Sequence, residues 1–206
     1  MAFPFSHPHI LFGHSRFRLA RDVRSVASGG GRMNHSEVSD PVWTITFTSV
    51  QLRERDLAEL TAWWDNLRSG LRSALVTQNV TCRPFAHANP ANAAPAQNPG
   101  NLVSVTDGNV LSVDSVDAAL TLQPGDLIGL EVGAYRGLHR VVAVTGAGTT
   151  SRIITVDPPP RSYVAQAGAV VRFERPELVM RPVPGSFSVP DEGLPRVSFS
   201  FVESRQ

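Results

Sequence analysis

Two stretches near opposite ends of the chain alternate between apolar and polar residues. Residues 43–47 read WTITF, and residues 197–201 read VSFSF. A period of two places the apolar side chains on one face of a β-strand, while the Thr and Ser side chains face the other way. Each stretch therefore predicts a half-buried antiparallel strand.

The segment that follows the first of these strands has the period of a helix. Its apolar residues recur at spacings of three and four: Leu57, Leu60, Trp64, Leu67 and Leu71. This spacing forms one stripe, and Glu54 and Asp56 lie where the helix dipole favours acids. We expect a helix over about residues 53–69. Because an amphipathic helix needs a sheet to cover, we expect residues 1–81 and 176–206 to form one domain with both strands.

The middle of the chain has a different character. Residues 82–101 are rich in Ala, Asn and Pro without periodicity, which predicts a linker or an extended loop. From 102 to 175 the chain has short β-rich runs separated by turn signals such as Asp107–Gly108 and Pro124–Gly125. Five or six short strands in one segment favour a small, closed or nearly closed barrel of the OB or SH3 type. The expected fold class is mainly β, with this barrel inserted into the terminal domain.

A glycine-rich loop separates two strand-like runs near the N-terminus. It extends over residues 25–41 and contains three consecutive glycines at 29–31. No helix follows directly and no GK[ST] sequence is present, so a phosphate-binding loop is not favoured. We expect a long hairpin arm.

The composition agrees with a mainly β fold and excludes some functions. Only 18% of the residues are charged, below the common share of about 25%, and the 16 Gly and 16 Pro favour strands and turns. All 19 basic residues are arginine, which excludes lysine Schiff bases and P-loop lysines. The formal charge is only +1, so we expect no sequence-specific binding to nucleic acid.

The single cysteine and the lengths of the apolar segments indicate the compartment in which the chain is made. Cys82 is alone, so it forms neither an internal disulfide nor a CxxC metal site. The N-terminus has no basic region before its apolar part, which argues against a signal peptide. No apolar run approaches the roughly 20 residues that span a bilayer. We expect synthesis in a reducing cytoplasm and no membrane partner.

No constellation of residues points to catalysis or to a metal. His7 and His9 form an HxH pair, but no cysteine or acid follows at ligand spacing. His139 lies downstream of Asp126 and Glu131, and a hydrogen-bonded histidine in a barrel wall is favoured over a catalytic pair. The chain has no G-x-S-x-G elbow. We expect no catalytic residue, metal ligand or cofactor, and therefore no enzyme.

Apolar side chains in unusual positions are candidates for contacts between subunits. Prolines keep the N-terminal stretch from forming one regular helix, and its apolar residues need a surface to cover them. Trp63 lies beside the helical stripe, within reach of a neighbour. The residues that we assign to an oligomer interface are Phe3, Phe5, Ile10, Phe12 and Trp63. The alternative for each of them is packing on its own domain.

The order of these elements resembles that of the distal tail proteins of long-tailed bacteriophages and related gene transfer agents. It runs from a strand (VWTITFTSV) through a Trp-bearing helix (LAELTAWWDNLRSG), a further strand and an inserted barrel to a return strand (PRVSFSFVE). The most specific stretches are residues 62–70, 122–130 and 138–142. In that family the terminal segments form a β-sandwich, called the belt domain. Six copies close into a ring that joins the tail tube to the hub of the tail tip.

The resemblance implies a non-enzymatic virion protein at the tail tip, assembled in the cytoplasm of the host bacterium. Its implied partners are further copies of itself in a hexamer, the tail tube protein and the tail-tip hub protein. Two other functions stay open: a tail-tip module that binds a carbohydrate or another part of the host surface, and a hydrolase with an unrecognised site. The barrel segment offers few aromatic residues for sugar binding, namely Tyr135, Tyr163 and Phe173.

Overall fold

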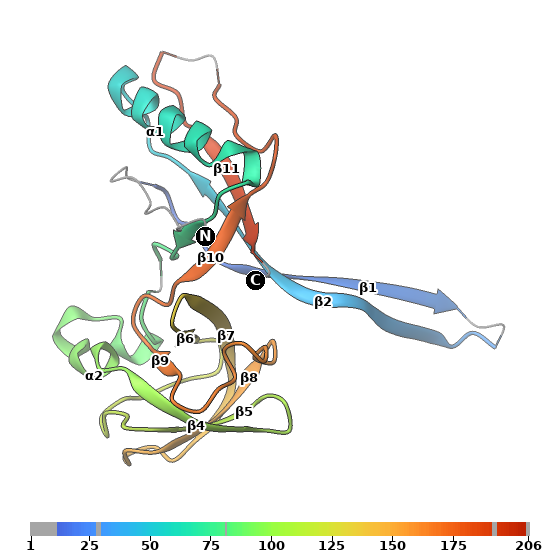
Figure 1. Ribbon diagram of the computed structural model, residues 1–206, viewed down its shortest axis with the longest axis vertical. Coiled ribbons are helices and arrows are strands. Elements are labelled where there is room, and N and C mark those ends of the chain that lie inside the picture. Colours follow the sequence, from blue (N-terminus) through green and yellow to red (C-terminus); the bar gives the residue numbers. More distant parts are fainter. Residues whose placement is uncertain (1–11, 28–29, 81, 191–192, 205–206) are drawn as a thin grey trace.

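The computed structural model of the chain describes residues 12–27, 30–80, 82–190 and 193–204. These residues form a five-stranded sheet, a closed six-stranded barrel and one long helix (Figure 1). Strands hold 43% of the chain and helices 14%, which confirms the expected mainly β fold class. A helix-bearing sheet together with a small barrel agrees with the expected β-sandwich and inserted barrel.

The sheet joins segments from the two ends of the chain. Its strands lie in the order β1 (Arg18–Ala27), β2 (Met33–Thr48), β11 (Ser198–Glu203), β10 (Leu178–Pro182) and β3 (Ala74–Val76). All neighbours are antiparallel, and residues 45–47 of β2 lie opposite residues 199–201 of β11. The two alternating stretches of the sequence are therefore direct neighbours, and their apolar side chains form one surface.

Helix α1 (Glu54–Asn66) covers this apolar surface. Leu60 is fully buried, and the rings of Trp63 and Trp64 lie 5.2–6.1 Å from those of the phenylalanines at 199 and 201. The helix is thus the second layer over the central strands of the sheet, as its apolar stripe predicts.

The end of the helical stripe differs from the expectation. Leu71 was expected in the stripe, but its side chain is 75% exposed. Arg68 and Ser69 have positive φ values of 49° and 51°, within the short 3-10 helix η1 (Arg68–Gly70). These left-handed residues turn the chain before Leu71 can reach the sheet, so the buried stripe ends at Leu67.

The segment from 82 to 101, expected as a linker or an extended loop, is a connection built of short helical turns rather than extended chain. It contains three helical turns: η2 (Phe85–His87), η3 (Pro90–Asn92) and α2 (Ala94–Gln97). Proline near the start of the second and third turns and the Asn89 cap favour helical turns. Ala96 packs into the barrel core, and His87 Nε2 accepts a hydrogen bond from the Thr121 amide at 2.9 Å. The segment is therefore fixed to the barrel.

The barrel consists of strands that are contiguous in sequence. Their order around it is β4 (Gly100–Thr106), β5 (Val110–Asp114), β8 (Arg152–Asp157), β7 (Tyr135–Thr145), β6 (Leu127–Val132) and β9 (Val170–Arg172), which pairs again with β4. Alternate side chains fill the interior, among them Leu102, Leu111, Ile128, Ile154, Val171 and Phe173. The chain enters near Cys82 and leaves near Arg175, where the Arg175 amide donates to the Cys82 carbonyl at 2.6 Å.

Trp43 connects the sheet to the barrel. Its side chain is only 1% exposed, and its indole N–H donates to the carbonyl of Leu138 in β7 at 2.7 Å. The guanidinium of Arg140, also in β7, lies 5.3 Å from the centroid of the indole ring. Leu138 belongs to the apolar core of the sheet rather than to that of the barrel. The two parts therefore share one buried junction.

Candidate functional site

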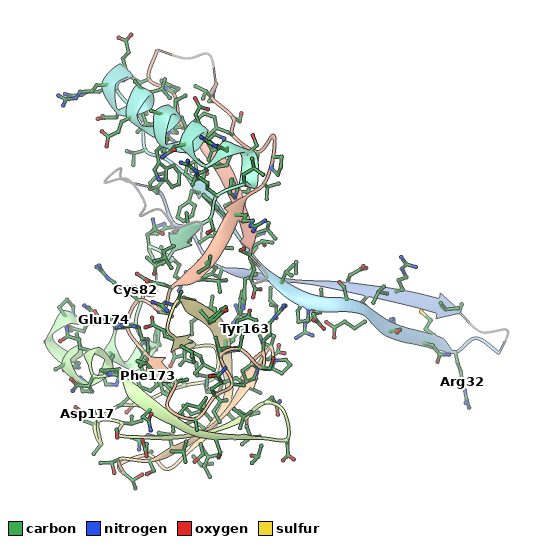
Figure 2. The ribbon with its side chains drawn as sticks, in the orientation of Figure 1. Arg32, Cys82, Asp117, Tyr163, Phe173 and Glu174 are labelled. Carbon is green, nitrogen blue, oxygen red and sulfur yellow. The ribbon has the colours of Figure 1, made fainter. Side chains whose placement is uncertain are left out.

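Strands β1 and β2 continue beyond the sheet as a two-stranded arm. Their pairing extends from Arg18 opposite Thr44 to Ala27 opposite Met33, close to the turn. Figure 1 shows the arm extending away from both the sheet and the barrel, and Figure 2 places Arg32 at its far end. The long hairpin arm is thus present as predicted, but the expected loop at 25–41 is too long, because residues 25–27 and 33–41 belong to the paired strands β1 and β2.

The arm exposes apolar side chains on both of its faces. Residues 22–27 and 30–40 are all exposed. The large apolar side chains among them are Val23, Val26, Met33 and Val38, with Val26 and Met33 65% and 66% exposed. A two-stranded hairpin is only marginally stable by itself in water. An arm of this composition gains stability when another surface covers it.

The root of the arm is fixed to the barrel by charged side chains. Arg21 donates to both carboxylate oxygens of Asp157 at 2.6 Å and to Glu37 at 3.0 Å. The hydrogen bond to Asp157 is the main cause that raises the pKa of Arg21. Two register shifts lie between Ala20 and Val23, directly beside this contact. Bulges of this kind bend a ribbon, so the root sets the direction in which the arm extends.

The residues expected at an oligomer interface lie in different surroundings. Phe12 packs edge-on against Phe47 and Phe199 of its own sheet, with centroid distances of 5.3 and 5.5 Å. Trp63 is half-buried over the same sheet. Phe3, Phe5 and Ile10 lie outside the described residues. The role of these five residues between subunits stays a prediction.

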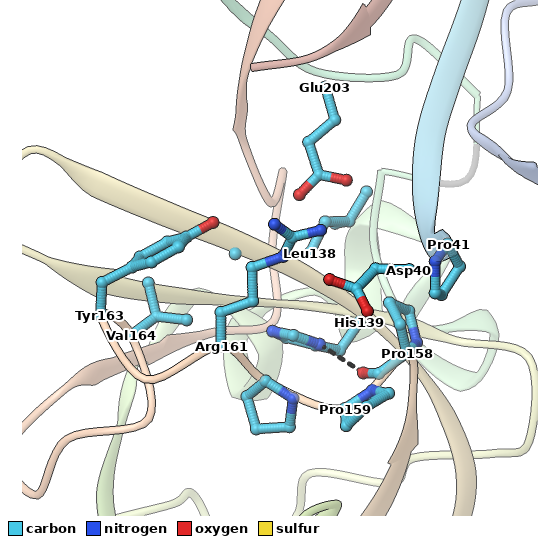
Figure 3. Close-up of a pocket in the computed structure, with 12 residues that line it drawn as sticks. Asp40, Pro41, Leu138, His139, Pro158, Pro159, Arg161, Tyr163, Val164 and Glu203 are labelled. Atoms are coloured by element: carbon cyan, nitrogen blue, oxygen red, sulfur yellow. Dashed lines mark hydrogen bonds between the residues drawn. The ribbon is translucent and has the colours of Figure 1, made fainter. Parts of the chain in front are cut away.

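A cavity of about 210 Å³ lies at the junction of the sheet and the barrel (Figure 3). Its lining comes from the root of the arm, the end of β11, strand β7 and the loop after β8. The lining residues are Asp40, Pro41, Gly137, Leu138, His139, Pro158, Pro159, Pro160, Arg161, Tyr163, Val164 and Glu203. These positions are spread over more than 160 residues of sequence, and only the pairing of strands brings them together.

His139 is the most unusual side chain of this cavity. It is 3% exposed, and its Nδ1 lies 2.8 Å from the carbonyl oxygen of Pro158. A carbonyl only accepts hydrogen bonds, so Nδ1 carries the proton and Nε2 is a bare acceptor. Nε2 is buried and has no hydrogen-bond partner. Burial, assisted by the nearby Arg161 charge, lowers the pKa of His139 to about 4, so the ring is neutral at pH 7.

The carboxylates that precede His139 in the sequence do not contact it. Asp126 accepts hydrogen bonds from the amides of Phe85 and Gln123, and Glu131 pairs with Arg172 at 2.6 Å. The expectation of a hydrogen-bonded barrel-wall histidine is confirmed. No local pattern in the sequence indicates that Nε2 lacks a hydrogen-bond partner. The one local signal beside the cavity is the run of three prolines after β8.

The expectations about metal sites and membrane segments can be compared with the structure only for the described residues. His7 and His9 lie outside them. Within the described ranges no group of three or more His, Cys, Asp or Glu side chains is arranged to hold a metal ion. In the same part of the chain no helix is both long and apolar enough to cross a membrane. Neither a protein-family model nor a curated protein matches this chain.

Proposed function

We propose that this chain is a structural subunit of a phage-like tail, which forms a hexameric ring at the distal end and joins the tail tube to the tail-tip hub. The observation that supports the proposal best is the arm. Its far half, residues 22–27 and 30–39, is exposed on both faces and carries large apolar side chains. Such a ribbon is suited to lie on a neighbouring subunit.

The shape of the subunit is compatible with a head-to-tail contact between neighbours. The arm extends away from the body, so it can lie on a surface of the next subunit that differs from the arm itself. A heterologous contact of this kind closes into a ring when its rotation angle fits, and otherwise propagates into a filament. Closure also covers the unpaired edges of the arm strands, which would otherwise be sites of aggregation.

The remaining parts of the proposal follow from this role. The partners are further copies of the chain, the tail tube protein and the hub protein. The protein resides at the tail tip of the virion after assembly in the cytoplasm of the host bacterium. It acts as a connector and not as an enzyme.

The proposal is tested by sedimentation velocity of the full chain over a range of concentrations. In one variant, residues 23–38 are replaced by Asn–Gly, which connects Asp22 to its strand partner Ser39 through a two-residue turn. This variant keeps the Arg21–Asp157 contact and the whole body of the subunit. We expect the native chain to form a closed assembly and this variant to stay monomeric. Its circular dichroism spectrum should show that the sheet and the barrel remain folded.

Point variants make the test specific for the apolar side chains of the arm. We expect Val26→Thr combined with Met33→Thr to weaken assembly at least tenfold. The matched control is Val142→Thr combined with Ile153→Thr, which alters two side chains on the barrel that are 51% and 53% exposed. The control is expected to assemble normally. Equal assembly of the native chain and the variant without the arm would refute the proposed role of the arm.

A further inference from the structure

Two adjoining hollows form one groove along the border of the sheet and the barrel. The first, of about 740 Å³, is lined by Arg16, Arg18 and threonines of β2. The second, of about 590 Å³, is lined by Arg16, by Arg140 of β7 and by residues 123–126, which precede β6. Arg16 and Phe17 line both hollows, so the two meet there. We call the combined hollow the arginine groove.

The sheet part of the arginine groove lies on the face opposite helix α1. Ile45 and Phe47 belong to the apolar core beneath the helix, so the alternating Thr44 and Thr46 face the other way. Arg18 is the strand partner of Thr44, and residues that are directly paired share a face of the sheet. The side chain of Arg18 is exposed, so this part of the groove is open to a partner.

The groove concentrates positive charge in a chain that carries little of it. The formal charge of the whole chain is only +1, whereas the lining of the groove contains one acid, Asp126, and four arginines, namely Arg16, Arg18, Arg83 and Arg140. Asp126 already accepts hydrogen bonds from two backbone amides. In the described part of the chain Arg83 pairs with Glu174, and the other three arginines form no ion pair. Three guanidinium groups are thus placed to receive an anionic partner.

Apolar surface lies beside these charges. The side chain of Phe85 lines the groove and is 69% exposed. Its backbone is held in place, because its amide donates to Asp126 at 2.9 Å and the turn η2 begins with it. Pro124 and Leu127 line the same hollow. Aromatic and arginine side chains together are typical of a contact with a protein partner, whereas a small inorganic anion would use only the arginines.

Acidic side chains limit the groove on the side of the barrel. Asp157 is the strand partner of Arg140, and Glu174 pairs with Arg83. A nucleic acid carries a charge on every nucleotide, so its binding needs a basic surface that extends over many phosphates. A short acidic segment of protein needs only the groove, and its carboxylates can form bidentate hydrogen bonds with arginines. The charges therefore favour an acidic polypeptide over a nucleic acid.

We propose that the arginine groove binds a short acidic segment of a partner protein. Its carboxylates pair with Arg16, Arg18 and Arg140, and an apolar side chain of the same segment packs on Phe85. The groove lies outside the exposed far half of the arm. The inference therefore goes beyond the proposed contact between subunits and does not depend on it.

The test is fluorescence anisotropy of a labelled synthetic peptide, titrated with the full chain at a concentration where the chain is monomeric. The peptide has a central Phe–Leu pair between two runs of aspartate, and its control has asparagine in place of every aspartate. We expect saturable binding of the acidic peptide that weakens with salt, and binding of the asparagine peptide that is weaker by about tenfold or more. A single-stranded thymidine oligonucleotide that binds the groove more tightly than the acidic peptide would overturn the inference.

Three variants make the result specific for the groove. Arg16→Glu combined with Arg18→Glu should weaken binding of the acidic peptide by about tenfold or more. The matched control is Arg53→Glu combined with Arg55→Glu, which changes the net charge equally at two exposed positions at the start of α1, and it should bind as the native chain does. Phe85→Ala should weaken binding of the same peptide but not of one that lacks the Phe–Leu pair. Absence of saturable binding to the native chain, or equal losses in the two double variants, would overturn the inference.

Discussion

Replacement of Trp43 by phenylalanine probes the junction between the sheet and the barrel. Phenylalanine keeps an aromatic ring opposite Phe17, whose centroid lies 6.2 Å from that of Trp43. The change removes the indole N–H that donates to the Leu138 carbonyl at 2.7 Å. It also removes part of the surface that Arg140 contacts at 5.3 Å. The substitution is therefore small in shape but specific in chemistry.

The expected loss of stability comes from three sources. A buried hydrogen bond contributes about 1 kcal/mol net. The smaller ring leaves a space of roughly 40 Å³, which costs about 1 kcal/mol at about 24 cal/mol per Å³. Lost apolar burial and a weaker cation–π contact add about 1 kcal/mol. We expect Trp43→Phe to lower the free energy of unfolding by about 3 kcal/mol.

The measurement is urea unfolding followed by circular dichroism at low protein concentration, where assembly adds no stability. The matched control is Trp64→Phe, the same change in a half-buried side chain that keeps its stacking on Phe187. We expect the control to lose about 1 kcal/mol or less. Equal losses in the two variants would contradict the reasoning, because the indole hydrogen bond of Trp43 would then contribute nothing to the junction.

Three further expectations concern the barrel and its wall. The free energy of unfolding of the native chain, relative to that of His139→Asn, should fall by about 1.4 kcal/mol per pH unit from about pH 6.5 down to about pH 4. The reason is that the unfolded histidine takes up a proton in this range, whereas the folded one, with its pKa lowered to about 4, does not. Unfolding curves of both proteins at several pH values check this, and the same pH dependence in both would contradict it. Gly137→Ala should cost about 1–3 kcal/mol, since a Cβ there lies 2.9 Å from both His139 Nε2 and Val164 Cγ2, whereas Gly193→Ala meets no atom within 4 Å and should be neutral in the same assay. A fragment of residues 82–175, which keeps the helical turns that pack on the barrel, should unfold cooperatively, as scanning calorimetry would show. A featureless trace would refute the division into two domains.

The sequence predicted those features that depend on local periodicity. The alternation at 43–47 and 197–201 is sufficient to define two strands with one buried face, because a shift by one residue would expose every apolar side chain. The stripe of α1 and the glycine-rich tip of the arm are local in the same sense. Each of these elements is set mainly by its own residues.

Features that depend on the whole fold were not predictable. The helix ends before Leu71 because Arg68 and Ser69 adopt left-handed φ values, and neither residue type signals such a conformation. The alternation around Trp43 indicates burial but not the hydrogen bond to Leu138. The cavity around His139 combines residues from distant strands, and its unpaired Nε2 results from tertiary packing alone.

The mass of the assembly in solution tests the central claim most directly. Native mass spectrometry of the full chain, alone and mixed with the tail tube protein, reports the number of copies. Six chains of 22.3 kDa predict a species of about 134 kDa, and electron microscopy of the same sample should show rings with six-fold symmetry. A chain that remains at 22.3 kDa at every concentration, with the tail tube protein present, would contradict the account.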